Sequence, residues 1–135
     1  MTAQASLSVR NSRLNAVEAE IGSSPILRIY EGILPENCAA SVGTDTLLAE
    51  MTLPANWLED ASDGMVSKLG LWETTALETG TAGYFRIYDS GGTTCHMQGT
   101  VTQVGFQGEM LFEDTEFVAT YPVVIATFVL VEGNN

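Results

Sequence analysis

The segment "YFRIYDSGGTTCH" (residues 84–96) places Asp89, Ser90 and two glycines just ahead of His96, the one histidine of the chain. A nucleophilic serine needs a general base within about 2.6–3.2 Å and an acid that orients that base. The only candidate base is His96, which follows in the strand that leaves the same turn. Aspartate, serine and paired glycines are typical of a hairpin turn, in which glycine supplies a positive φ. We therefore expect a hairpin here and not a catalytic Ser90.

The two cysteines add little catalytic chemistry. Cys95 and His96 are neighbours on one predicted strand, so their side chains point to opposite faces and do not form a nucleophile–base pair. A pairing of Cys38 with His96 stays open. The spacing of the cysteines matches no metal motif, and a single histidine adds too few ligands for zinc. We expect a protein that is not an enzyme and that has no cofactor and no metal.

The charge of the chain restricts its partners. Seventeen acidic residues against five basic ones give a net charge of −12, which repels nucleic acid and anionic membrane surfaces. No apolar run approaches the roughly 20 residues of a membrane span. The first residues lack the apolar region of a signal peptide, so we expect the protein to begin in the cytoplasm where it is made.

The first part of the chain has a helical period. Leu14, Val17 and Ile21 recur at positions i, i+3 and i+7, and Gly22 is a natural stop. We predict one short amphipathic helix over residues 9–21, preceded by a small polar arm. Residues 1–22 are thus expected to form an N-terminal arm and helix, separate from a domain over residues 23–135.

From residue 26 onward the apolar period is two, which is the period of β-strands. Glycine, asparagine, aspartate and proline clusters separate the apolar segments. The pattern predicts an all-β fold, an antiparallel β-sandwich or jelly-roll-like barrel of about seven to eight strands. The predicted strands lie within residues 26–32, 46–53, 65–75, 83–90, 95–105, 109–113 and 122–132.

Arginine and tyrosine share one face of two of these strands. Arg28 and Arg86 lie opposite the apolar face of their strands, and Tyr30, Tyr84 and Tyr88 lie on the same face as the arginines. Tyrosine and arginine are enriched in protein–protein contacts, although an outer face balanced by acidic neighbours is equally consistent with the pattern.

Trp57 follows a proline in a predicted loop. Tryptophan favours a core or a subunit interface, and stacking on a sugar ring is the alternative. With the helix residues and the arginine–tyrosine face, the candidate interface residues are Leu14, Val17, Ile21, Arg28, Tyr30, Trp57, Tyr84, Arg86 and Tyr88.

A run of short segments resembles small structural proteins of tailed bacteriophages. These segments are "RNSRLNAVEAEIG", "SPILRIYEGILPENCAA", "TLLAEMTLP", "TAGYFRIYDSGGTTCHMQGTV" and "VVIATFVLVEGN". The resemblance covers nearly the whole chain and carries no active-site residue. The chain departs from the family pattern in "DTEFVATYPVV", where Phe117, Tyr121 and Pro122 replace small residues and glycine, which affects any contact made at the tip of the last hairpin.

The resemblance implies a non-enzymatic virion protein, expected to be a capsid decoration or cement protein that binds the major capsid protein or other virion proteins. It implies a homo-oligomer, a trimer or dimer, located in the virion and in the host cytoplasm during assembly. The alternatives are a tail or neck protein of the same particle and a carbohydrate-binding module that uses Trp57, Tyr84 or Tyr88.

Overall fold

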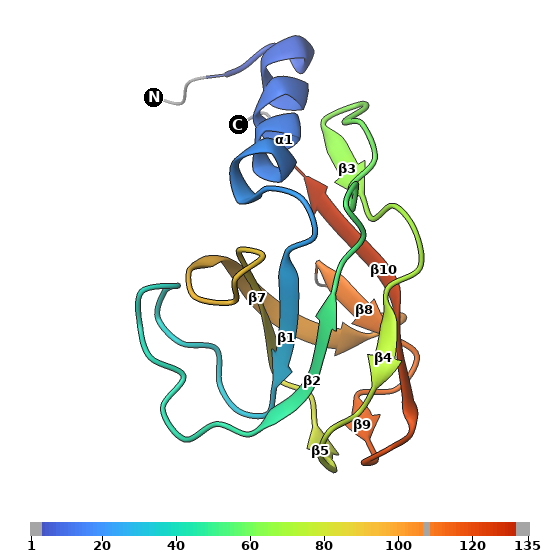
Figure 1. The fold of residues 1–135 in the computed structure, drawn as a ribbon. Coiled ribbons are helices and arrows are strands. Elements are labelled where there is room, and N and C mark those ends of the chain that lie inside the picture. The colour runs from blue at the N-terminus through green and yellow to red at the C-terminus, as the bar shows by residue number, and fades with distance from the viewer. Residues whose placement is uncertain (1–3, 107–108, 132–135) are drawn as a thin grey trace.

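Eight of the described strands form one strongly curled sheet, two short strands pair with each other beside it, and a helix lies at one end of the sheet (Figure 1). The computed structural model describes residues 4–106 and 109–131. Within these residues the elements are α1 (Leu7–Ile21), β1 (Ile26–Tyr30), β2 (Leu47–Thr52), β3 (Met65–Ser67), β4 (Glu73–Thr75), β5 (Gly80–Thr81), β6 (Tyr84–Tyr88), β7 (Cys95–Gln103), β8 (Met110–Phe112), β9 (Glu116–Phe117) and β10 (Pro122–Val131).

The helix has the ends that its sequence favours. The Ser6 side chain accepts a hydrogen bond from the Val9 backbone N–H and so caps the first turn. Gly22 ends the helix at φ 96°, where its N–H donates to the Glu18 carbonyl. The predicted helix is confirmed, and it begins at Leu7, slightly earlier than the apolar period indicated.

The expected antiparallel sandwich is not confirmed. Seven strands follow one another in the order β2-β1-β6-β7-β8-β10-β3, with β4 also paired to β10, and they curl into a half-barrel. Most neighbours are antiparallel, but β7 and β8 run parallel, with Val101 opposite Met110. Strand β8 therefore runs beside β7 in the same direction, which makes the sheet mixed. The predominantly β architecture with one helix is confirmed.

The apolar faces of β1 and β6 form the centre of the core. Leu27 pairs with Ile87 and Ile29 with Phe85, and none of the four side chains is more than 1% exposed. A chain of aromatic rings extends this core. The Phe85 and Phe128 ring centroids lie 5.6 Å apart, those of Phe128 and Trp72 5.3 Å, and those of Trp72 and Trp57 6.2 Å.

Helix α1 is joined to the β-strands by its polar and apolar side chains together. The Glu18 carboxylate accepts hydrogen bonds from the backbone N–H groups of Trp57 and Leu58, each at 2.8 Å. Asn11 and Asn15 accept from the backbone N–H groups of Gly64 (2.9 Å) and Ala61 (2.8 Å). Leu14 and Ile21 are buried in the same hydrophobic cluster as the strands. The helix is therefore part of the β-domain's core.

Replacing Leu14 with aspartate is expected to undock α1 and to lower the free energy of unfolding by about 3 kcal/mol, because a carboxylate would be buried without a partner. Leu14 is only 3% exposed. Ser12→Asp puts the same charge on the exposed side of the same helix and should change stability little. Urea unfolding followed by circular dichroism compares the two variants. Equal midpoints for both would show that α1 is not held by its apolar side.

Candidate functional site

A hollow opens where β8 and β10 separate. Ile125 of β10 pairs with Phe112 at the end of β8, whereas the preceding residues of β10 pair with β4 on the other side. Between β8 and β10 the chain passes through β9, which pairs with β5. The resulting fork site has a cavity volume of about 540 Å³ and is lined by Phe112, Glu113, Asp114, Glu116, Phe117, Val118, Tyr121, Pro122, Val123 and Val124.

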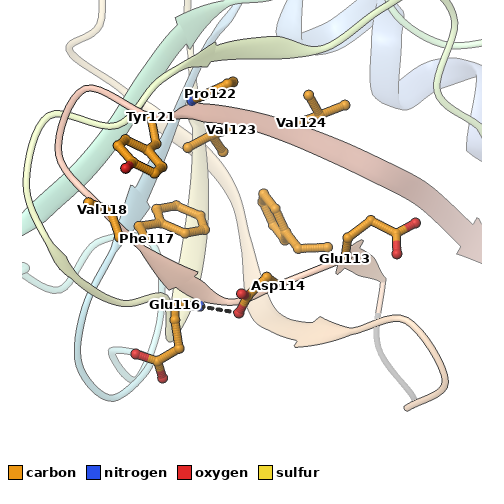
Figure 2. A pocket seen from close by; sticks show the side chains of 10 residues that line it. Glu113, Asp114, Glu116, Phe117, Val118, Tyr121, Pro122, Val123 and Val124 are labelled. Carbon is orange, nitrogen blue, oxygen red and sulfur yellow. Dashed lines mark hydrogen bonds between the residues drawn. The ribbon is translucent and has the colours of Figure 1, made fainter.

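Local turns hold the outer arm of the fork site. The Asp114 carboxylate accepts a hydrogen bond of 2.9 Å from the Glu116 backbone N–H, as Figure 2 shows. Tyr121 N–H donates to the Val118 carbonyl, closing a turn in which Thr120 has φ 74°. Tight turns of this kind keep the segment from collapsing onto β10.

The base of the fork site is buried, but its rim is apolar and exposed. The rings of Phe112 and Phe117 meet at 5.5 Å and are 1% and 5% exposed. By contrast, Tyr121 is 63% exposed, Val118 45% and Val124 43%. Apolar side chains that stay in water around a hollow are typical of a binding surface.

Acidic side chains stand beside this apolar rim. Glu113, Asp114 and Glu116 are all exposed, and the lining contains no basic residue. The lining also lacks serine, cysteine and histidine. No group of three or more histidine, cysteine, aspartate or glutamate side chains able to hold a metal occurs among the described residues. An apolar rim beside acidic side chains would suit an apolar group that carries positive charge.

The arginine–tyrosine face lies elsewhere, and the structure corrects its expected exposure. The connection between β1 and β2, residues 31–46, covers this face and is named here the covering loop. The Arg86 guanidinium donates to the backbone carbonyls of Asn37 (3.0 Å) and Ala40 (2.7 Å). Arg86 also donates to the Gln98 side chain, and Gln98 donates to the Pro35 carbonyl at 2.7 Å. Arg86 is consequently only 3% exposed.

The tyrosines of this face are also buried. Tyr30 and Tyr84 stack with ring centroids 5.2 Å apart, and the Tyr84 hydroxyl donates to the Asp45 carboxylate at 2.7 Å. Burial raises the pKa of Tyr30 to about 12, with a hydrogen bond to Tyr88 adding to the effect. Burial, followed by the contact with Asp45, raises the pKa of Tyr84. Both hydroxyls therefore stay protonated at neutral pH, and that of Tyr84 acts as a structural hydrogen-bond donor.

Arg28 is the member of this face closest to solvent, with a side chain that is 24% exposed. Its Nε forms an ion pair of 2.6 Å with Glu50. Its guanidinium carbon lies 4.6 Å from the centre of the Tyr88 ring, and Tyr88 is 7% exposed. The predicted residues on this face are thus brought together, but as a polar layer under the covering loop.

Trp57 belongs to the core. It is 0% exposed, and its indole N–H donates to the Gly22 carbonyl at 3.0 Å. Together with the burial of Tyr84 and Tyr88, this leaves none of the three expected sugar-stacking residues available to a ligand. The structure thus gives Trp57 the core position that its residue type favours, and what the sequence does not reveal is that α1 folds back over residues 57–64.

The three helix residues border two other hollows beside β7. Leu14 and Val17 line one of about 620 Å³, and Val17 and Ile21 line another of about 280 Å³ that includes His96. Leu14 and Ile21 are themselves buried, and Val17 is half-buried. The main role of these residues is therefore to dock α1 onto the strands.

The Asp89–Thr94 segment is the hairpin that its residues predicted. Strands β6 and β7 pair antiparallel on either side of it, and Asp89 N–H donates to the Thr94 carbonyl. Backbone hydrogen bonds from Thr93 and Thr94 lower the pKa of the Asp89 carboxyl. The carboxylate is thus used in shaping the turn, while Ser90 and His96 are exposed beside it.

Sequence reasoning missed much of the fork site. Glu113, Asp114, Val118 and Val124 carried no signal, since each fits an ordinary strand or turn. The one position-specific signal was the presence of Phe117, Tyr121 and Pro122 where the resembling phage proteins were expected to have small residues and glycine, and all three line the hollow.

Comparisons with protein-family models, with curated proteins and with solved structures find no match to this chain. Among the described residues, no helix is long and apolar enough to cross a membrane.

Proposed function

We propose that this chain is a non-enzymatic structural protein of a tailed-phage virion, a capsid decoration protein that attaches to the head shell through the fork site. The observation that carries the proposal is the exposed apolar rim of that hollow, with Tyr121, Val118 and Val124 in water. The resemblance of several short segments to structural proteins of tailed bacteriophages supports a tailed-phage virion as the particle.

The geometry of the fork site favours a protein partner. Figure 2 shows Phe117, Val118 and Tyr121 at one end of the hollow and Glu113 at the other, with Val123 and Val124 along β10 between them. An elongated hollow of this kind fits the side chains of an extended peptide segment. Aromatic and aliphatic anchors in such a hollow supply most of the energy of a protein contact.

The charge of the site defines the partner further. Glu113, Asp114 and Glu116 stand on the rim of a chain whose net charge is −12. A partner segment with an apolar anchor flanked by lysine or arginine would be attracted before contact and held after it. We assign this segment to the major capsid protein. The same acidic charge keeps free copies soluble in the host cytoplasm before they join the virion.

Repeated symmetric sites on a shell favour symmetric ligands, so the proposed protein is a trimer or dimer. Light scattering of the purified protein tests this directly, since the mass would be two or three times the 14.4 kDa of one chain.

The attachment itself is tested by adding the purified protein to capsids that lack it and imaging the particles by electron microscopy. Copies at regular positions over the whole shell would support a decoration protein. Copies confined to one vertex or to the tail would overturn that assignment in favour of the alternative, a tail or neck protein. Capsids that stay bare would contradict both virion assignments.

Val124→Asp is expected to reduce capsid occupancy at least about tenfold, because a carboxylate in the hollow adds repulsion and loses an apolar contact. Met65→Asp is the matched control. Met65 lies on β3 and is 48% exposed, compared with 43% for Val124, and the change of charge is the same. Binding should also weaken as salt rises, since part of the attraction is between exposed charges. Equal occupancy for both variants would exclude the fork site as the attachment surface.

A further inference from the structure

The two cysteines, distant in sequence, lie on the same side of the sheet. Cys95 is the first residue of β7 and pairs with Tyr88 of β6. Tyr88 shares its face with Arg86, two residues earlier on the strand, so the Cys95 side chain belongs to the polar layer under the covering loop. Both cysteines are free thiols and both are half-buried.

Cys38 is held in the covering loop by the hydrogen bonds of Arg86. The carbonyls of Asn37 and Ala40, which flank Cys38, are the two backbone acceptors of the Arg86 guanidinium. The Asn37 side chain in turn accepts from the backbone N–H groups of Ala39 and Ala40, at 2.9 and 3.0 Å, which makes a tight turn around Cys38. Buried Arg86 thus fixes the part of the loop that carries the cysteine.

Both cysteines belong to this layer, because Cys38 lies in the loop turn that Arg86 holds and Cys95 lies on the strand face that this loop covers. Burial, and next the hydrogen bond with the Cys38 thiol, raises the pKa of the Cys95 thiol to about 12. The Cys95 Sγ also lies 3.5 Å from the Met97 carbonyl oxygen, to which the thiol donates. The turn that carries Cys38 and the start of β7 that carries Cys95 are thus held on the same face of the sheet in the reduced protein.

We propose that Cys38 and Cys95 form a disulfide that fastens the covering loop to β7 when the protein meets a small-molecule disulfide such as oxidised glutathione. The Cys38 thiolate attacks one glutathione sulfur and forms a mixed disulfide, releasing one glutathione, which takes up a proton. Cys95 then loses its proton to solvent and attacks the Cys38 sulfur, which expels the second glutathione. Two protein thiols are oxidised and one oxidised glutathione is reduced to two molecules of glutathione.

The bond would act on the stability of the covering loop. It closes a long segment of chain, which restricts the unfolded state, and it adds a covalent tie to a loop now held by hydrogen bonds. The cytoplasm keeps thiols reduced, so the bond would form after release into an oxidising medium. This inference does not depend on the fork site, and its test needs no capsid.

The test incubates the full-length protein with oxidised glutathione and compares it with protein kept in dithiothreitol. We expect a mass loss of two hydrogen atoms, loss of both reactive thiols, and a melting temperature at least about 5 °C higher than that of the reduced protein. The disulfide should also slow protease cleavage within residues 31–46. Because Cys95 is a poor thiolate at neutral pH, ring closure should accelerate steadily as pH rises from 7 to 9.

Cys38→Ser and Cys95→Ser serve as the variants, each expected to form a mixed glutathione adduct and no internal bond. Neither should gain melting temperature on oxidation. The reduced wild-type protein is itself a control that needs no mutation. Mixed adducts on both cysteines of the wild type, or a disulfide between two chains on a non-reducing gel, would overturn the proposal.

Discussion

Trp57→Ala is expected to lower the free energy of unfolding by about 4 kcal/mol. The indole is 0% exposed and packs against Trp72 with ring centroids 6.2 Å apart, so its removal opens a cavity in the aromatic chain of the core. The change also leaves the Gly22 carbonyl at the end of α1 without the indole N–H that now donates to it. Urea unfolding followed by circular dichroism measures the loss.

Trp57→Phe separates these two contributions. Phenylalanine keeps most of the buried area and loses only the donor to Gly22, so we expect a cost of about 1 kcal/mol. Trp72 then remains as the single fluorescent reporter of the core. If Trp57→Ala cost no more than Trp57→Phe, the indole would not be part of the packed core described above.

Arg86→Met is expected to cost about 4 kcal/mol, because methionine fills the space of the side chain but satisfies none of its partners. Arg86 is 3% exposed and donates to two backbone carbonyls of the covering loop and to Gln98. Backbone carbonyls cannot be removed by a compensating mutation, so the loop must move into water to recover hydrogen bonds. The expected results are a lower urea midpoint and faster protease cleavage within residues 31–46.

Arg28→Met is the matched control for Arg86. This variant removes the same charge from the same face of the sheet, on the neighbouring strand. The ion pair that Arg28 forms with Glu50 is partly in water, with side chains 24% and 41% exposed. A cost of about 1 kcal/mol is expected, without a change in loop cleavage. Similar costs for both variants would mean that the covering loop is not held by Arg86.

The sequence alone determined the features that depend on neighbours along the chain. The helix ends where Gly22 follows the last apolar position, and the turn after Asp89 is a hairpin because its residue types favour one. The division of β1 into an apolar face, with Leu27 and Ile29, and a polar face, with Arg28, also follows from strict alternation. These are local properties, so a single sequence suffices to predict them.

Only the tertiary structure decided what each face contacts. Alternation assigns Arg86 and Tyr84 to one face, but not the loop that buries them, because that loop is held by hydrogen bonds between residues about 40 or more positions apart. The parallel pairing of β7 with β8, and hence one mixed half-barrel in place of a sandwich, also depends on long-range pairing.

The same holds for the fork site and for the placement of the cysteines. Val124 has the residue type of a buried strand position, and it is exposed only because β8 ends at Phe112 and β10 continues beside β4. Cys38 lies on the same face of the sheet as Cys95 only because Arg86 holds the loop that carries Cys38. Local residue preferences set the strands and turns of this chain, whereas the order of the strands in the sheet set which surfaces stay open and which side chains meet.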